Sequence, residues 1–346
     1  MPHRPAVVPT VVDALEGRTM FDSLTAGVTA VTSVTTARPN KNWTITLTAG
    51  QAIYLAAGET TASAFQTQLI LIAPTGKAIA RSVGDSGSFM GKVAPVTGTY
   101  VVRVRDTDGT HTGPIQVTAF YTGASTIADG DDAYTMESGR RYAASISPGD
   151  LDVWKIDASA VSQFISIVAN ENSTGSSVGV GVAVIGPNGQ GVSAKESESG
   201  FALDIPKAAK GTYYAVAYEP GANASGRYGI SLGKTPGSQT TEDPDTQTAL
   251  VSGQTRTGDL PSGDIDLFQT TLSAGKKVTI TFARNGSSVT PAILLIDPSG
   301  NQVATSSGTS TTTLTYTTLT SGLFSILLRN RDASTGGAYK LTYTVA

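Results

Sequence analysis

The stretch ILLIDPSGNQVATS, residues 293–306, places an aspartate, a proline and a glycine directly after four apolar residues. The same pattern recurs as LILIAPTGKAIARS at 69–82 and as VAVIGPNGQGVSAK at 182–195. Proline followed two residues later by glycine predicts a type I turn, with proline at its second position and glycine at its fourth. Alanine and glycine replace Asp297 in the other two copies, so we interpret this aspartate as a turn residue and not as a catalytic one.

The spacing of these turns predicts three tandem domains. The turn prolines, Pro74, Pro187 and Pro298, are 113 and 111 residues apart. A second set of aromatic positions, Tyr100, Tyr213 and Phe324, has the same two spacings. Independent anchors that share one period are the signature of a repeat architecture. We therefore predict an N-terminal tail over 1–20 and domains over 21–123, 124–235 and 236–346.

Alternating side chains identify the repeated elements as β-strands. In TYVVRVR the residues Tyr100, Val102 and Val104 lie on one face, whereas Arg103 and Arg105 lie on the other. Short strands separated by turns rich in glycine, proline and serine are typical of antiparallel sandwiches. The sequence thus predicts an all-β chain of three tandem antiparallel β-sandwiches of the jelly-roll or immunoglobulin-like type.

Two further features bear on the predicted cores. The Ser/Thr-rich run 309–322 is either a flexible loop or a strand with Leu314 and Tyr316 on one face, and the alternation favours the strand. Trp43 and Trp154 stand near the start of their units. An exposed tryptophan can stack on sugar rings, but one that begins a strand favours a half-buried place in the core.

Composition excludes several classes of site and partner. A net charge of −3 provides no overall basic field for nucleic acid, which we therefore do not expect as a partner. Cysteine is absent, so disulfides, thiolate metal sites and cysteine nucleophiles are excluded. No run of 18 apolar residues is present, and we expect no transmembrane helix.

The acidic sets near the second and third units are the candidate metal ligands. Each of these two units has a Gly-Asp-x-Asp segment, and an acidic cluster precedes that segment at the domain junction. Ca²⁺ requires six to eight oxygen ligands, so a calcium site would need the segment and the cluster together. The candidates are Asp129, Asp131 and Asp132 with Asp150 and Asp152, and Glu242, Asp243 and Asp245 with Asp264 and Asp266. The alternative is that these residues cap turns and keep the junctions soluble.

Two other segments have partial metal-ligand patterns. In the first unit, Asn40 and Asn42 stand in place of the two aspartates, and no site is expected there. The loop RDTDGT, residues 105–110, begins like a calcium loop but lacks the later glutamate.

The order of these motifs resembles a known family. An acidic start, Gly-Asp-x-Asp before an aromatic residue, Asp-Pro-x-Gly after an apolar run and Ser/Thr-Gly before the Tyr/Phe strand are similar to the bacterial pre-peptidase C-terminal (PPC) domain. The resemblance covers nearly all of 20–346 and implies β-sandwiches of secreted bacterial proteins, often accessory to hydrolases, some of which bind calcium or matrix polymers. The segment ALEGRTMFDS, residues 14–23, resembles more weakly the LEPR-XLL motif of bacterial surface proteins.

No catalytic set is evident, and the sequence predicts no enzyme. Ser86 lies in VGDSGSF, which echoes the nucleophile loop of chymotrypsin-like proteases. In that fold the base histidine precedes the serine, whereas His3 lies in the tail and His111 follows. Cofactor loops with a strand followed by a helix are also missing.

We therefore expect a non-enzymatic extracellular structural protein, secreted or at the cell surface. It would be a subunit of a surface layer, filament or matrix that associates with itself or with other surface proteins. The apolar tail segment AVVPTVV, residues 6–12, either adds as an edge strand to a neighbouring subunit or is a mobile or targeting segment. Two alternatives remain open: a secreted module that binds a polysaccharide or matrix polymer with or without Ca²⁺, and an accessory region of a secreted hydrolase.

Overall fold

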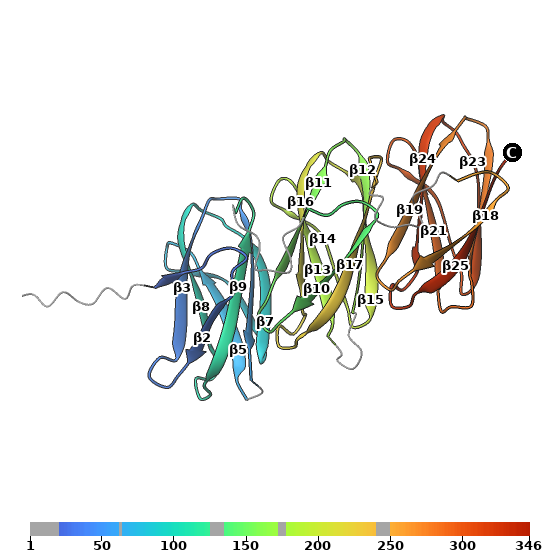
Figure 1. Cartoon of the computed structure of the whole chain (residues 1–346). Helices are drawn as coiled ribbons and strands as arrows, with labels where there is room; N and C mark the ends of the chain where they lie inside the picture. Colours follow the sequence, from blue (N-terminus) through green and yellow to red (C-terminus); the bar gives the residue numbers. More distant parts are fainter. Residues whose placement is uncertain (1–20, 62–63, 125–134, 172–177, 240–249) are drawn as a thin grey trace, which may run out of the picture.

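The computed structural model describes residues 21–61, 64–124, 135–171, 178–239 and 250–346. Within these ranges the chain consists of strands, turns and bends. The described part of the chain has no helix that is long and apolar enough to cross a membrane. Three antiparallel β-sandwiches follow one another along an elongated molecule (Figure 1). The predicted fold class is confirmed.

The strands of the three sandwiches have closely similar lengths and order. The first sandwich contains β1 Asp22–Ser23, β2 Ala30–Val34, β3 Asn40–Leu47, β4 Ala52–Glu59, β5 Gln66–Ile72, β6 Ala78–Asp85, β7 Gly87–Val93, β8 Gly98–Asp106 and β9 Gly113–Tyr121. The second contains β10 Arg140–Ile146, β11 Asp152–Ala158, β12 Gln163–Glu171, β13 Val180–Ile185, β14 Gly191–Ser197, β15 Gly200–Ala208, β16 Gly211–Tyr218 and β17 Gly226–Thr235. The third contains β18 Thr255–Leu260, β19 Ile265–Leu272, β20 Lys277–Arg284, β21 Pro291–Ile296, β22 Gln302–Ser307, β23 Thr311–Thr317, β24 Gly322–Asn330 and β25 Gly337–Val345.

All three sandwiches have jelly-roll topology. The front sheets have the orders β3-β8-β5-β6, β11-β16-β13-β14 and β19-β24-β21-β22. The back sheets have the orders β2-β9-β4-β7, β10-β17-β12-β15 and β18-β25-β20-β23. The two-residue strand β1 extends the first front sheet by pairing with β3 in parallel.

The repeated turn has the predicted geometry. The backbone N–H of Gly300 donates to the carbonyl of Asp297 at 3.0 Å, and the equivalent bond is 2.9 Å long in both other units. Oδ1 of Asp297 accepts from the N–H groups of Ser299 and Asn301 at 2.9 and 2.8 Å. Gly300 has a φ of +77°, a conformation that favours glycine. The aspartate therefore closes its own turn.

The predicted core residues are buried. Tyr100 and Phe324 have no exposed surface, and Trp43 and Trp154 also lie in their cores. Trp154 donates from Nε1 to the hydroxyl of Tyr228 at 2.8 Å, so its one polar group is satisfied inside the sandwich. The Ser/Thr-rich run forms β23 and the strand interpretation is confirmed.

A short segment anchors the beginning of each sandwich, and the sequence did not reveal it. An apolar residue packs inward at Leu24, Met136 and Leu250. A glycine with positive φ follows three residues later and donates its N–H to the last strand of the back sheet: Gly27 to Ala119, Gly139 to Leu232, and Gly253 to Tyr343. The repeat thus includes the chain entry as well as the turns.

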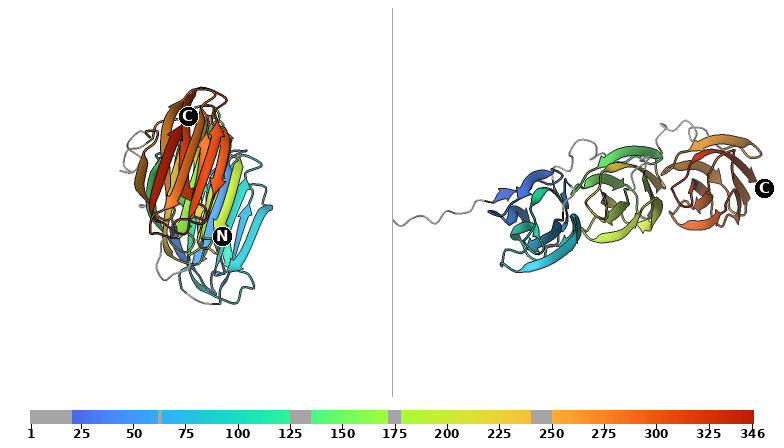
Figure 2. Two further views of the ribbon diagram at one scale, coloured as in Figure 1. Left: turned by 90° about the vertical axis from the view of Figure 1, so that its right-hand side faces the viewer. Right: turned by 90° about the horizontal axis from the view of Figure 1, so that it is seen from below.

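The six sheets form a continuous stack. The back sheet of the first sandwich packs on the front sheet of the second, and the back sheet of the second packs on the front sheet of the third. The right-hand view of Figure 2 shows the three sandwiches following one another along the long axis. Only the first front sheet and the third back sheet have an outer face that no other sheet of the described chain covers.

Candidate functional site

The contact between the first and second sandwiches is aromatic. Phe120 of β9 lies 5.1 Å from Tyr214 of β16, measured between ring centroids. Phe89 of β7 stacks on Tyr218 of β16 with ring centroids 3.8 Å apart. Phe120 belongs to the same cluster of buried side chains as the core of the second sandwich. The apolar interior therefore continues across the domain boundary.

Burial of Tyr218 makes this contact sensitive to high pH. Desolvation raises the pKa of Tyr218 to about 12, and the nearby carboxylate of Glu196 adds to the shift. Below the ordinary tyrosine pKa of about 10, both folded and unfolded states keep the proton. Between about pH 10 and about pH 12 the unfolded state ionises first, so the folded state loses stability as the pH rises.

We expect the urea midpoint to fall between about pH 10 and about pH 12, and to fall less in Tyr218→Phe. Phenylalanine keeps the ring that stacks on Phe89 but has no proton to lose. Denaturation followed by circular dichroism measures the effect. The same pH dependence in both proteins would show that Tyr218 does not control it.

The contact between the second and third sandwiches is apolar with an ionic lock. Phe164 and Val168 of β12 pack with Leu327 of β24 in a separate buried cluster. Beside this cluster, Arg329 binds the carboxylate of Asp204 through two hydrogen bonds of 2.6 and 2.8 Å. The two side chains are 13% and 29% exposed, so solvent screens the pair less than a surface pair.

We expect a double-mutant cycle with Arg329→Gln and Asp204→Asn to give a coupling energy of about 1–3 kcal/mol. The exposed pair Lys155 and Asp157, 3.2 Å apart, is the matched control and is expected to give below about 1 kcal/mol. Chemical denaturation of the single and double variants measures both. Equal coupling in the two cycles would contradict an ionic lock at the interface.

The first aspartate of each Gly-Asp-x-Asp segment closes a turn beside a domain interface. Oδ1 of Asp150 accepts from the N–H of Leu151 at 2.9 Å, and Oδ1 of Asp264 accepts from the N–H of Ile265 at 2.8 Å. Asp264 also accepts from the hydroxyl of Ser231 in the preceding sandwich at 3.2 Å. These contacts correspond to the turn-capping alternative.

The second aspartate of each segment is buried inside its sandwich. Asp152 and Asp266 have no exposed surface. The hydroxyl of Tyr339 donates to Oδ2 of Asp266. The first and second aspartates therefore have different surroundings, the first at the interface between sandwiches and the second in the sandwich interior.

The remaining members of the predicted acidic sets lie outside the described residues. They are Asp129, Asp131, Asp132, Glu242, Asp243 and Asp245. The structure therefore does not test whether the junction clusters meet the Gly-Asp-x-Asp segments, and calcium binding there stays a prediction.

Strand register corrects the predicted correspondence in the first unit. Trp43 pairs with Val102 in the same way that Trp154 pairs with Ala215. Counting back two residues places Lys41, and not Asn42, at the position of Asp152. A single-residue offset moves a side chain to the other face of a strand. Asn40 and Asn42 therefore lie on the outer face of the first front sheet.

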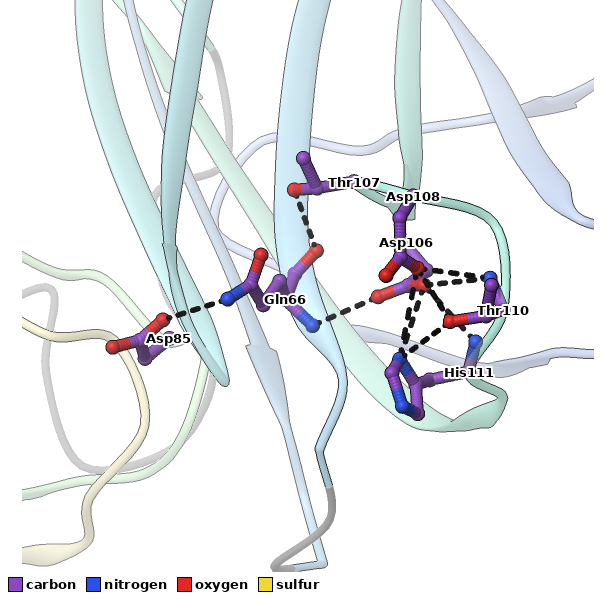
Figure 3. A network of polar contacts seen from close by, with 7 residues as sticks. All are labelled: Gln66, Asp85, Asp106, Thr107, Asp108, Thr110 and His111. Atoms are coloured by element: carbon purple, nitrogen blue, oxygen red, sulfur yellow. Dashed lines mark hydrogen bonds and ion pairs between the residues drawn. The ribbon is translucent and has the colours of Figure 1, made fainter.

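The loop after β8 contains a potential metal-ligand group of the described chain. Ligand atoms of Asp106, Asp108 and His111 lie within 4.8 Å of one another. Figure 3 shows how they converge. Hydrogen bonds, with Asp106 as the first partner and Thr110 as the next, hold the pKa of Asp108 below its usual value. The group lies where the sequence showed a partial calcium-loop pattern.

The carboxylate of Asp106 already organises its own loop. Its oxygens accept from the N–H groups of Gln66, Thr110 and His111 at 2.9, 3.0 and 3.0 Å. The equivalent residue of the second sandwich, Glu219, likewise accepts N–H groups of its own loop, and Asn330 occupies this place in the third. The uncharged amide of Asn330 thus accepts a backbone hydrogen bond at the place of the Asp106 carboxylate. This supports a structural role for Asp106 in its loop.

Sequence reasoning did not single out Arg329 or Asp204. Their pairing joins strands 125 residues apart in the sequence. The available signal was the alternation in β8, which placed Arg103 and Arg105 on the face away from the core. Arg329 occupies the position of Arg105 in the third unit, because Asn40 pairs with Arg105 as Ile265 pairs with Arg329.

No family model matches the chain, and no curated protein matches it. Several solved structures are similar at low identity. The periplasmic inhibitor of g-type lysozyme from Aeromonas hydrophila, PliG, is 18% identical over 29% of this chain and 99% of its own, with a TM-score of 0.24. A triple jelly-roll protein of an archaeal virus turret is 9% identical over 93% of this chain and 89% of its own, with a TM-score of 0.21. Tripeptidyl peptidase 2 is 10% identical over 90% of this chain and 34% of its own, with a TM-score of 0.23. These likenesses carry no argument about function.

Proposed function

We propose that the chain is a non-enzymatic structural protein, secreted or at the cell surface, that serves as a stiff building block of a surface layer, filament or matrix. Its partners would be copies of itself or other surface proteins. The observation that carries the proposal is the uninterrupted stack of six sheets. Domains joined by extensive apolar contacts move as one body, whereas small polar contacts between domains permit relative motion.

A groove beside the first sandwich supports a route to assembly. It has a volume of about 700 Å³, lies between β1, β2 and β3, and is lined by Phe21, Val31 and Lys41 among others. β2 is an edge strand of its sheet, and β1 covers only Trp43 and Thr44 of β3. Backbone groups at a sheet edge pair readily with an added strand. The tail segment 6–12 of a neighbouring copy would add there by main-chain hydrogen bonding.

Negative-stain microscopy with sedimentation velocity tests this function. The full chain is expected to form filaments or sheets as its concentration increases, and a chain that lacks residues 1–20 is expected to remain monomeric. Assembly that is unchanged by the deletion would exclude strand addition by the tail but leave the structural role. A monomer at every concentration, with no surface protein bound, would contradict the structural role itself.

Calcium-dependent binding is the second candidate, and the position of the aspartates favours it. Asp150 and Asp264 each lie at an interface between sandwiches, where a bound ion would stiffen the stack. If Ca²⁺ binds, calorimetry on EDTA-treated protein is expected to show heat and a rise in melting temperature. Asp150→Asn with Asp264→Asn would reduce both. The absence of both binding heat and a change in melting temperature would contradict calcium binding by this protein.

A further inference from the structure

The outer face of the first front sheet has an unusual set of side chains. We call it the arginine face and define it as Asn40 and Asn42 of β3, Gln68 of β5, Arg81 of β6, and Arg103 and Arg105 of β8. Strand register places them in two neighbouring rows across the sheet. In Figure 1 this sheet lies at the end of the molecule away from the second sandwich.

Two of these arginines are held in place by neighbouring amides. Nε of Arg103 donates to Oδ1 of Asn42 at 2.8 Å, and Nε of Arg105 donates to Oε1 of Gln68 at 2.7 Å. These bonds use the Nε–H of each guanidinium and not its terminal amino groups. The two arginines lie two residues apart on one face of β8, about 7 Å along the strand.

The face has an apolar base beneath the guanidinium groups. Ile70 points outward but is only 4% exposed, and strand register places Arg103 and Arg81 on its two sides. Arginine stems commonly cover apolar surface in this way while the charged ends remain in water. The described outward positions of β3, β5 and β8 contribute no acidic side chain to the face. Asp85 of β6 lies on the same side of the sheet, in the row beyond Gln68, where it accepts from the amide of Gln66.

The third sandwich shows what this position binds. Arg329, the equivalent of Arg105, binds the carboxylate of Asp204 with both terminal nitrogens. In the first sandwich no other sheet of the described chain covers the corresponding arginine. The chain itself therefore provides a precedent for carboxylate binding at this sheet position.

The other positions of the face differ from the covered one. Ile265, Leu267 and Leu327 form the apolar contact in the third sandwich. Their equivalents by strand register are Asn40, Asn42 and Arg103. Protein interfaces depend on buried apolar and aromatic anchor residues. At the equivalent positions of the arginine face, the side chains are hydrogen-bond donors instead. The arginine face keeps the arginine that is equivalent to Arg329 but lacks the apolar residues around it. Such a face suits a hydrated polymer better than the apolar surface of another sheet.

We propose that the arginine face binds an acidic polysaccharide whose carboxylates pair with Arg103 and Arg105. The amides of Asn40 and Asn42 would bind the sugar hydroxyls, whereas Gln68, which is 4% exposed, positions Arg105. Paired N–H groups of a guanidinium match the two oxygens of a carboxylate, which gives geometry as well as charge to the contact. This inference goes beyond the structural role and does not depend on self-assembly.

Affinity electrophoresis of the full chain in gels that contain polygalacturonate tests the proposal, with EDTA present so that Ca²⁺ does not bridge the components. We expect the polymer to retard the wild-type protein, whereas neutral dextran does not. Arg103→Gln with Arg105→Gln is expected to weaken binding about tenfold or more. Arg103→Lys with Arg105→Lys retains the charge and the stems and is expected to weaken binding to a smaller extent.

The matched control is Lys277→Gln with Lys340→Gln, which removes two positive charges from the third back sheet. This variant is expected to bind like the wild type. The proposal is overturned if polygalacturonate causes no retardation, or if the lysine variant loses as much binding as the arginine variant. Dextran sulfate that binds equally well to wild-type and arginine variants would indicate general charge attraction and would also overturn it. Dimerisation without polymer that disappears in the arginine variant would assign the face to a second copy instead.

Discussion

A chain that carries Leu327→Asp is expected to lose the contact between its second and third sandwiches while each sandwich keeps its fold. Leu327 is fully buried, but it packs in the cluster between the sandwiches and not in the core of the third. An unpaired carboxylate buried among Phe164, Val168 and Ile265 costs several kcal/mol, because apolar side chains cannot replace its hydration. Separation of the sandwiches returns the carboxylate to water.

Limited proteolysis and sedimentation velocity measure this separation, with circular dichroism as the check on the fold. The expected changes are cleavage between the second and third sandwiches and a lower sedimentation coefficient. Leu323→Asp is the matched control, because Leu323 lies on the same strand and face as Leu327 but is 41% exposed. A Leu327 variant that behaves like the Leu323 variant would contradict the interface.

Trp154→Ala is expected to destabilise the protein by about 3–5 kcal/mol, the usual cost of removing a large aromatic side chain from a core. Trp154 packs against Tyr142 with ring centroids 5.2 Å apart and donates to Tyr228. The substitution therefore leaves a cavity and removes the hydrogen bond to Tyr228. The effect extends beyond the second sandwich, because its front sheet packs on the first and its back sheet packs on the third.

Urea denaturation followed by circular dichroism measures the loss, and both neighbouring sandwiches are expected to unfold at lower urea with the second. Val161→Ala is the control: Val161 is 75% exposed, and its loss is expected to change stability by no more than about 0.5 kcal/mol. An equal effect of the two substitutions, or neighbours that unfold at an unchanged midpoint, would show that the sandwiches are independent.

The fold was predictable because its signals are local. The turn around Pro298 and the alternation after Tyr100 each depend on residues that are close in the sequence. Both patterns recur in all three units, which makes a chance match improbable. The entry anchors at Leu24 and Met136 were missed, because one apolar residue before a glycine is too short a pattern to stand out. The one-residue error at Asn42 arose because spacing alone does not determine which face a residue occupies.

The stacking of the sandwiches was not predicted, although the sequence contains a trace of it. VGVAVI of β13 and PAILLI of β21 are apolar on both faces, whereas an exposed sheet face would alternate. These strands belong to front sheets that a neighbouring sandwich covers. The partners of the acidic turns were unpredictable for a similar reason: Asp150 accepts from Thr29, which lies 121 residues away in another sandwich.

The central claim is that the three sandwiches form one rigid body, and small-angle X-ray scattering of the wild-type chain at low concentration tests it most directly. The scattering curve is expected to match the single elongated arrangement of Figure 1, apart from the N-terminal tail. A curve that fits only a flexible ensemble of three independently moving domains, with a larger radius of gyration than the stack, would contradict it.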